Sequence, residues 1–202
     1  VEFRFMKHNI LYDYKKIDEA IELLKKAVKA FPDHETKFMT HLAYLYKKKN
    51  VYDEGLEIID GLWEKYPDDL DILNKKIYWH MYLGQKEKSL NTAKQLTERN
   101  PNNGNFHDSY GEALTEFGEY EEALKEFKKA LELEPFGWFS YNSYLQMAKC
   151  YKGLGKYDLA KKSLKEGEKA IHTTFCCADM RKEWKQKRDK VLAEIEELEA
   201  KK

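Results

Sequence analysis

The chain has 202 residues, of which 42% are hydrophobic and 36% charged; this is too apolar for a disordered protein and too charged for a membrane-spanning one. Its 36 Lys and Arg balance its 36 Asp and Glu, so the formal net charge is zero, whereas a dedicated nucleic-acid-binding protein usually carries a basic excess. No apolar run approaches the length of a membrane span, so we expect neither nucleic acid nor a membrane as a partner.

Three series of residues recur along the chain with a common period. The prolines Pro32, Pro67, Pro101 and Pro135 are spaced by 35, 34 and 34 residues. Twelve positions before each proline stands a small residue, and a third series lies between the two. The small series is Ala20, Gly55, Ser89, Ala123 and Ala160, and the third series is Ala27, Leu62, Leu96, Ala130 and Gly167. A shared period of 34 to 35 residues predicts that the chain is built from internal repeats of one structural unit.

Five such units follow one another from the N-terminus. We place them at residues 1–34, 36–69, 70–103, 104–137 and 141–174. Because the chain begins at Val1 inside a periodic pattern, we expect it to be cut from a longer protein or processed.

A three-residue insertion at 138–140 separates the fourth unit from the fifth. With Phe136 and Gly137 it makes an aromatic loop. We expect Trp138 and Phe139 to pack across the joint between the two units. The alternative is an exposed hydrophobic contact site.

A last helix is predicted after the fifth unit, within residues 175–202. Its apolar residues recur at helical spacing, and such a helix would cover the exposed side of the fifth unit. These residues are Met180, Trp184, Val191, Ile195 and Leu198. In the fifth unit Lys161 and Glu168 stand at places that are apolar in earlier units, so we expect its outer surface to be less apolar.

The fourth unit shows the most complete pattern. Its characteristic residues are His107, Tyr110, Gly111, Leu114, Gly118, Tyr120, Ala123, Phe127, Ala130 and Pro135. In these residues the chain resembles the tetratricopeptide repeat family, whose period is 34 residues. The resemblance implies an all-α fold: a right-handed superhelical solenoid of about five helix-turn-helix units with a C-terminal capping helix. Gly111 and Ala123 would lie where the two helices of one unit cross.

No catalytic pattern is present: the sequence has no glycine-rich phosphate loop, no HExxH and no CxxC, and we expect no enzyme activity. The only cluster that resembles metal ligands is His172, Cys176, Cys177 and Asp179, and its spacing matches no standard zinc site. We therefore expect no metal and no cofactor. The odd count of three cysteines favours a reducing compartment, and we expect a cytoplasmic location.

Three further residues or groups invite a chemical interpretation, but packing explains them more simply. Cys150 stands at a core position of its unit. His107 occupies a family position that is usually aromatic, so we expect it to be packed rather than catalytic. Asp108, Glu112 and Glu116 recur every four residues and are more simply an acidic stripe on one helix face than a general acid–base pair.

The resemblance also implies a binding groove. In the family, the first helices of the repeats line a concave wall, and repeat places 2, 5, 9 and 12 usually face inward. From these places we select thirteen groove residues: Phe5, Asn9, Tyr12, Lys37, Tyr44, Lys47, Asn74, Tyr78, Met81, Asp108, Glu112, Lys149 and Lys152. The wall is aromatic and mixed in charge in the first three units, acidic in the fourth and basic in the fifth.

The function that the resemblance implies is a non-enzymatic protein–protein interaction module, a scaffold or adaptor that binds a peptide or helix of another protein in its concave groove. The alternative is a regulatory or substrate-docking region of a larger enzyme whose catalytic domain is absent from this chain. Self-association through the convex face or the last helix is a third hypothesis. RNA binding has the least support, because the chain is neutral.

Overall fold

The computed structural model describes residues 16–173 and 178–201, and within these ranges the chain consists of helices and their connections, with no strand. The predicted all-α fold is therefore confirmed. The chain forms two compact units, residues 1–85 and 86–202. The division falls between the two helices of the third predicted repeat.

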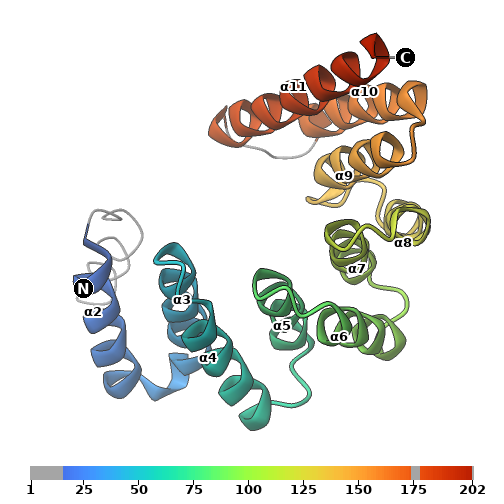
Figure 1. Cartoon of the computed structure of the whole chain (residues 1–202). Coiled ribbons are helices and arrows are strands. Elements are labelled where there is room, and N and C mark those ends of the chain that lie inside the picture. Colours follow the sequence, from blue (N-terminus) through green and yellow to red (C-terminus); the bar gives the residue numbers. More distant parts are fainter. Residues whose placement is uncertain (1–15, 174–177, 202) are drawn as a thin grey trace. The chain divides into compact units, whose positions relative to one another are not determined.

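The first unit contains four α-helices and one short 3₁₀ helix in its described part (Figure 1). They are α2 (Ile17–Ala30), η2 (Pro32–His34), α3 (Glu35–Lys48), α4 (Tyr52–Lys65) and α5 (Leu70–Tyr82). Each α-helix packs on the next, and the buried side chains between them form two core clusters, one between α2 and α3 and one among α3, α4 and α5.

The second unit contains six α-helices in the ranges that the structure describes (Figure 1). They are α6 (Lys86–Arg99), α7 (Gly104–Glu116), α8 (Tyr120–Leu133), α9 (Ser140–Gly153), α10 (Tyr157–Thr173) and α11 (Ala178–Ala200). The helices α6 to α10 pack pairwise in chain order. In addition, α7 contacts α9, and α11 packs on both α9 and α10.

The turn between the two helices has the same geometry in the second to fifth repeats. In each of these turns the second residue after the first helix has a positive φ. These residues are Asn50 (58°), Gly84 (65°), Gly118 (79°) and Gly155 (70°). The next residue donates its backbone N–H to a carbonyl five positions back, as Val51 does to Tyr46 at 3.0 Å and Glu119 to Leu114 at 2.9 Å. This is a Schellman motif, and it reverses the chain within a few residues.

The prolines mark the end of the second helix in the first four repeats. The helices α2, α4, α6 and α8 each end two residues before a proline. Because the residue before a proline disfavours the helical conformation, the helix stops there. In the loops that follow, the side chains of Asp69 and Asn103 accept backbone N–H groups at the starts of α5 and α7.

Small residues lie where large aromatic rings cross the neighbouring helix. A Cβ atom placed on Gly55 of α4 would lie 2.1 Å from the Trp79 ring of α5, and one on Gly111 would lie 2.7 Å from the Phe127 ring. Ser89, Ala123 and Ala160, which share the place of Gly55 in later repeats, have no exposed surface. The predicted close crossing of Gly111 and Ala123 is confirmed, and it leaves no room for a larger side chain.

The aromatic loop between α8 and α9 differs from our prediction. Phe139 is buried, with 1% of its surface exposed, but Trp138 is 67% and Phe136 81% exposed. Gly137 packs against the Phe139 ring, and the backbone N–H of Ser140 donates to the Gly137 carbonyl at 3.0 Å. The expectation that Trp138 packs across the joint was wrong, because the loop turns only Phe139 into the core.

The last helix, α11, covers α9 and α10 with Trp184, Val191 and Ile195, which are all buried, whereas Met180 and Leu198 are 41% and 38% exposed. It also explains the two charged residues of the fifth repeat. Lys161 pairs with Glu199 at 2.6 Å, and Glu168 pairs with Arg188 at 2.5 Å. Their charges therefore serve the contact with α11.

Two glycines of α4 provide a matched test of the ring contacts. We expect Gly55→Ala to lower the free energy of unfolding by roughly 1–3 kcal/mol, because the new methyl group must displace the buried Trp79 ring. Gly61→Ala, with no atom within 4 Å of its new Cβ, should instead raise it by about 1 kcal/mol through helix propensity. Urea denaturation followed by circular dichroism measures both. Shifts in the same direction would contradict the packing argument.

The α8–α9 loop gives a second test. Phe139→Ala should destabilise the protein by roughly 3–5 kcal/mol, because it leaves a cavity in the core. Trp138→Ala should change stability by less than about 0.5 kcal/mol, because the ring lies in solvent. Thermal unfolding of the two variants beside the wild type measures the difference. A large loss in Trp138→Ala would show that this side chain packs after all.

Candidate functional site

The structure distributes the predicted groove residues over both units. Phe5, Asn9 and Tyr12 lie outside the described residues. In the first unit α3 carries Lys37, Tyr44 and Lys47, and α5 carries Asn74, Tyr78 and Met81. In the second unit α7 carries Asp108 and Glu112, and α9 carries Lys149 and Lys152.

Lys47 is tied into an aromatic cluster of the first unit. Its ammonium donates to the Tyr82 hydroxyl and lies 3.9 Å from the centroid of the Tyr82 ring. The centroid of that ring lies 5.7 Å from those of Tyr52, at a tilted angle, and Trp79, in an edge-to-face contact. The cation–π contact links α3 to α5 and leaves Lys47 half-buried. The sequence pattern did not reveal Tyr82, because it stands outside the inward-facing repeat places.

Tyr44 keeps its ring accessible, with 39% of its surface exposed, and the Lys48 ammonium lies 5.2 Å from the ring centroid. Lys37, earlier on the same helix, is exposed. On α5, Tyr78 and Met81 are half-buried. The α3–α5 part of the first unit thus offers aromatic and apolar surface beside lysines.

Asn74 has an unsatisfied acceptor. Its Oδ1 atom is shielded from solvent and accepts no hydrogen bond from the described residues. Buried polar atoms are nearly always hydrogen-bonded, so a vacant one calls for a donor.

In the second unit, the side chains of α7 and α9 form a polar contact that we call the α7–α9 seam: Asp108, Glu112, Asn142, Ser143 and Gln146. The Ser143 hydroxyl donates to Asp108, and the Asn142 amide donates to Glu112. Gln146 also donates to Glu112, at 3.4 Å. Two of the three carboxylates in the predicted acidic stripe, Asp108 and Glu112, therefore contact α9, and the third, Glu116, is exposed.

Asp108 is the most deeply placed member of the seam, with 4% of its surface exposed. Burial raises its pKa well above the ordinary value of 3.8, the charge of Glu112 raises the pKa further, and the Ser143 hydrogen bond lowers it. Because the side chain is enclosed by α9, we leave Asp108 out of the surface proposed below to contact a partner.

Lys149 and Lys152 of α9 both lie near α11, but only Lys152 forms an ion pair with it. Lys152 donates to Glu194 of α11. Lys149 is half-buried and has no hydrogen bond or ion pair within the described part of the chain. Burial lowers its pKa; Lys187 and Lys152 lower it further, whereas Glu112 and Glu116 raise it.

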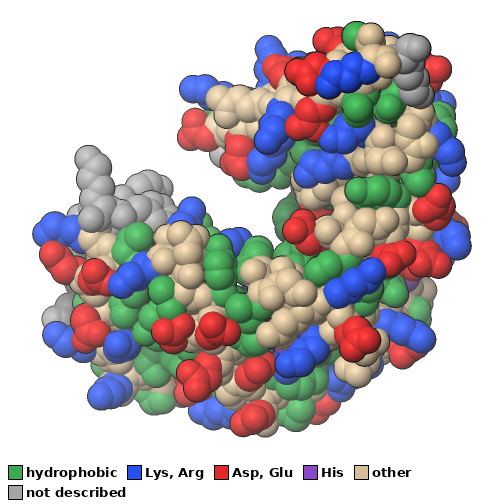
Figure 2. Space-filling view, viewed as in Figure 1, with side chains coloured by type: hydrophobic (Ala, Val, Ile, Leu, Met, Phe, Trp, Pro, Cys, Tyr) green, Lys and Arg blue, Asp and Glu red, His purple; other side chains and the backbone are tan. Residues whose placement is uncertain are grey.

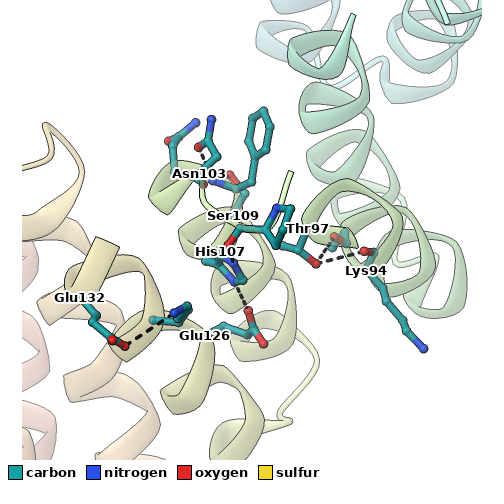
Figure 3. Close-up of polar contacts among 12 residues, drawn as sticks. Lys94, Thr97, Asn103, His107, Ser109, Glu126 and Glu132 are labelled. Atoms are coloured by element: carbon teal, nitrogen blue, oxygen red, sulfur yellow. Dashed lines mark hydrogen bonds and ion pairs between the residues drawn. The ribbon is translucent and has the colours of Figure 1, made fainter. Parts of the chain in front are cut away.

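His107 is packed, as predicted. Figure 3 shows it pointing from α7 toward Glu126 of α8, and its Nδ1 atom lies 2.7 Å from the Glu126 carboxylate. Its Nε2 atom lies 2.9 Å from the Pro101 carbonyl oxygen. Both neighbours are acceptors, so both contacts form as hydrogen bonds only when both ring nitrogens carry hydrogen. His107 thus joins α8 and the α6–α7 loop.

The cysteines give no sign of a metal site in the described residues. Cys150 is buried, its sulfur lies 3.1 Å from the Thr115 hydroxyl, and burial raises the pKa of the thiol. Cys176 and Cys177 lie outside the described residues. Among residues 16–173 and 178–201, no group of three or more His, Cys, Asp or Glu side chains could hold a metal ion.

Three family models described as tetratricopeptide repeat match residues 11–76, 79–137 and 141–170. The chain therefore belongs to the tetratricopeptide repeat family. No curated protein matches it. In the part of the chain that the structure describes, no helix has the length and apolar character required to cross a membrane.

Solved structures share the fold. TTC0263, a thermophilic tetratricopeptide repeat protein of Thermus thermophilus, is 22% identical, with a TM-score of 0.69 over 91% of this chain and 95% of its own. MamA AMB-1 is 22% identical, with a TM-score of 0.57 over 83% and 98% of the two chains. MamA from Desulfovibrio magneticus RS-1 is 11% identical, with a TM-score of 0.61 over 86% and 97%. At these identities the likeness concerns the fold.

The buried Asp108 leads to a pH prediction. Its pKa is higher in the folded than in the unfolded chain, so its contribution to stability is present below the ordinary value of 3.8 and is lost as the pH rises through the folded pKa. We expect Asp108→Asn to remove this dependence and to raise stability at neutral pH by about 1 kcal/mol or more. Urea denaturation of both proteins across a pH series measures the effect. A wild type that gains stability relative to Asp108→Asn as the pH rises would contradict it.

Proposed function

We propose that this chain is a non-enzymatic protein-interaction module, a scaffold or adaptor, whose first helices in each repeat contact a peptide or helix of another protein in a concave groove. Membership of the tetratricopeptide repeat family supports the interaction role. A cytoplasmic location, which the odd cysteine count favours, belongs to the same proposal.

The observation that carries the proposal is the accessible aromatic surface of α3 and α5. Tyr44 exposes 39% of its surface beside Lys48, and Tyr78 and Met81 are half-buried on α5. Tyrosine has few rotatable bonds and combines a large apolar ring with a hydroxyl, so it contacts a partner at low entropic cost. Asn74 lies on the same helix as Tyr78, and a partner that turns its amide outward would supply a peptide N–H to the unsatisfied Oδ1 atom.

The second unit contributes less of its predicted surface. Asp108 and Glu112 are engaged by α9, and Lys152 is engaged by Glu194 of α11. Lys149 therefore supports a partner contact better than its neighbours on α7 and α9.

The test compares two doubly substituted baits with the wild type in affinity capture from source-cell lysate, read by mass spectrometry. The first, Tyr44→Ser/Lys37→Glu, changes exposed residues of α3. The second, Glu57→Lys/Gly61→Ala, changes exposed residues of α4 as a matched control. A captured protein, once purified, should bind the wild type and the α4 variant with the same Kd. Its Kd for the α3 variant should be at least roughly tenfold higher.

Equal binding to all three baits would place the contact elsewhere and contradict the proposal for α3. Circular dichroism of each bait excludes unfolding as the cause of a loss. Sedimentation of the wild-type bait alone, over a range of concentrations, separates self-association from capture of a different protein.

A further inference from the structure

Among the half-buried lysines and arginines in the described part of the second unit, Lys149 is the one without an ion pair, since Lys152, Lys161 and Arg188 each have a carboxylate partner. An ammonium group that has lost part of its hydration is unfavourable unless an anion or acceptor replaces the water. Its lowered pKa has burial as its first cause, which agrees with this position.

The carboxylates whose charges act on Lys149 form no ion pair with it, and its cationic neighbour Lys187 already has a carboxylate partner. Glu112 accepts from Asn142 and Gln146 across the α7–α9 seam. Glu194 pairs with Lys152. Glu183 pairs with Lys187 at 2.7 Å, one helical turn away on α11. The remaining carboxylate that acts on Lys149 is Glu116, which is exposed on α7 and lies beyond ion-pair distance.

Two neighbouring lysines increase the positive electrostatic potential at Lys149. Lys152 and Lys187 are close enough to lower its pKa by repulsion, from α9 and α11 respectively. Figure 2 shows Lys and Arg side chains gathered over the end of the second unit that α9, α10 and α11 form, with acidic side chains among them. An incoming anion at Lys149 would relieve the repulsion among the three lysines.

We propose that the α9–α11 face of the second unit, centred on Lys149, binds an acidic segment of a partner protein, and that a partner carboxylate forms the ion pair that Lys149 lacks. This inference rests on the proposed interaction function and names the chemistry of the partner at this surface. Lys149 makes the direct contact, while Lys152 and Lys187 keep their ion pairs with Glu194 and Glu183.

A protein carboxylate fits this face better than a nucleic-acid backbone does. Glu112, Glu116 and Glu194 border the lysines, so the face is not uniformly basic and does not suit the continuous, fixed phosphate backbone of a nucleic acid. A protein segment carries its carboxylates on flexible side chains, so one of them can pair with Lys149 while the others remain in solvent. The zero net charge of the chain agrees with a local rather than a general anion site.

The test uses a fluorescein-labelled octaglutamate peptide and the full chain, with binding read as fluorescence anisotropy at low ionic strength. Lys149→Gln should raise the Kd roughly tenfold, the size expected for loss of a charge-assisted contact. Lys162→Gln, which removes the same charge from an exposed position on α10, is the matched control and should change the Kd less than about twofold. Glu116→Gln should tighten binding, because it removes a competing carboxylate.

Three results would overturn the inference: no measurable binding of octaglutamate to the wild type, equal weakening by Lys149→Gln and Lys162→Gln, or weaker binding by Glu116→Gln. If a single-stranded oligothymidylate binds more tightly than octaglutamate and its binding depends on Lys149, the partner at this face is a nucleic acid and not an acidic protein segment. If octaglutamate does not bind, but a captured partner still binds the α3 variant more weakly than the α4 variant, only the inference about Lys149 is wrong and the proposed function stands. If octaglutamate binds through Lys149 but no partner distinguishes those baits, the α3 surface is what fails.

Discussion

The close approach of neighbouring helices, with a glycine of one helix under an aromatic ring of the next, is the constraint on which the rest of the structure depends. Trp79 lies over Gly55, Phe127 over Gly111 and Trp184 over Gly167. Because the ring fills the space that a Cβ would occupy, each contact fixes both the separation and the rotation of the two helices. That rotation decides which side chains of a first helix enter the core and which remain at the surface.

Features that recur in every repeat could be predicted from the sequence. The prolines end the helices α2, α4, α6 and α8, and the positive-φ residues Asn50, Gly84, Gly118 and Gly155 stand 34, 34 and 37 positions apart. Both effects act on the local backbone, so spacing alone is sufficient to place them. The buried face of α11 was predictable for a similar reason, since Trp184, Val191 and Ile195 share one helical face.

Contacts that occur only once could not be predicted in this way. The Trp138–Phe139 pair lies in an insertion, where the repeat period no longer indicates which ring faces the core. Asp108 occupies an inward-facing place, but its burial depends on Ser143, 35 positions later, whose hydroxyl is small enough to fit against it. The partners of Lys161 and Glu168 belong to a helix outside the repeat series. In each case the deciding residue lies on another element and carries no periodic signal.

The first helix of each repeat has two tasks that compete for the same side chains. In α3, α7 and α9 it contacts a later helix of the same unit, and in the proposed function it must also contact a partner. Lys47, Glu112 and Lys152 are already engaged within the protein, by Tyr82, by the α9 amides and by Glu194. Tyr44 and Lys149 are the better candidates for a partner, and they differ in environment. Exposed charges are screened by salt and contribute little, whereas a half-buried charge is screened less. A contact at Lys149 would therefore discriminate between partners more sharply than one at the exposed Lys37, because a partner without an anion would leave the ammonium both desolvated and unpaired.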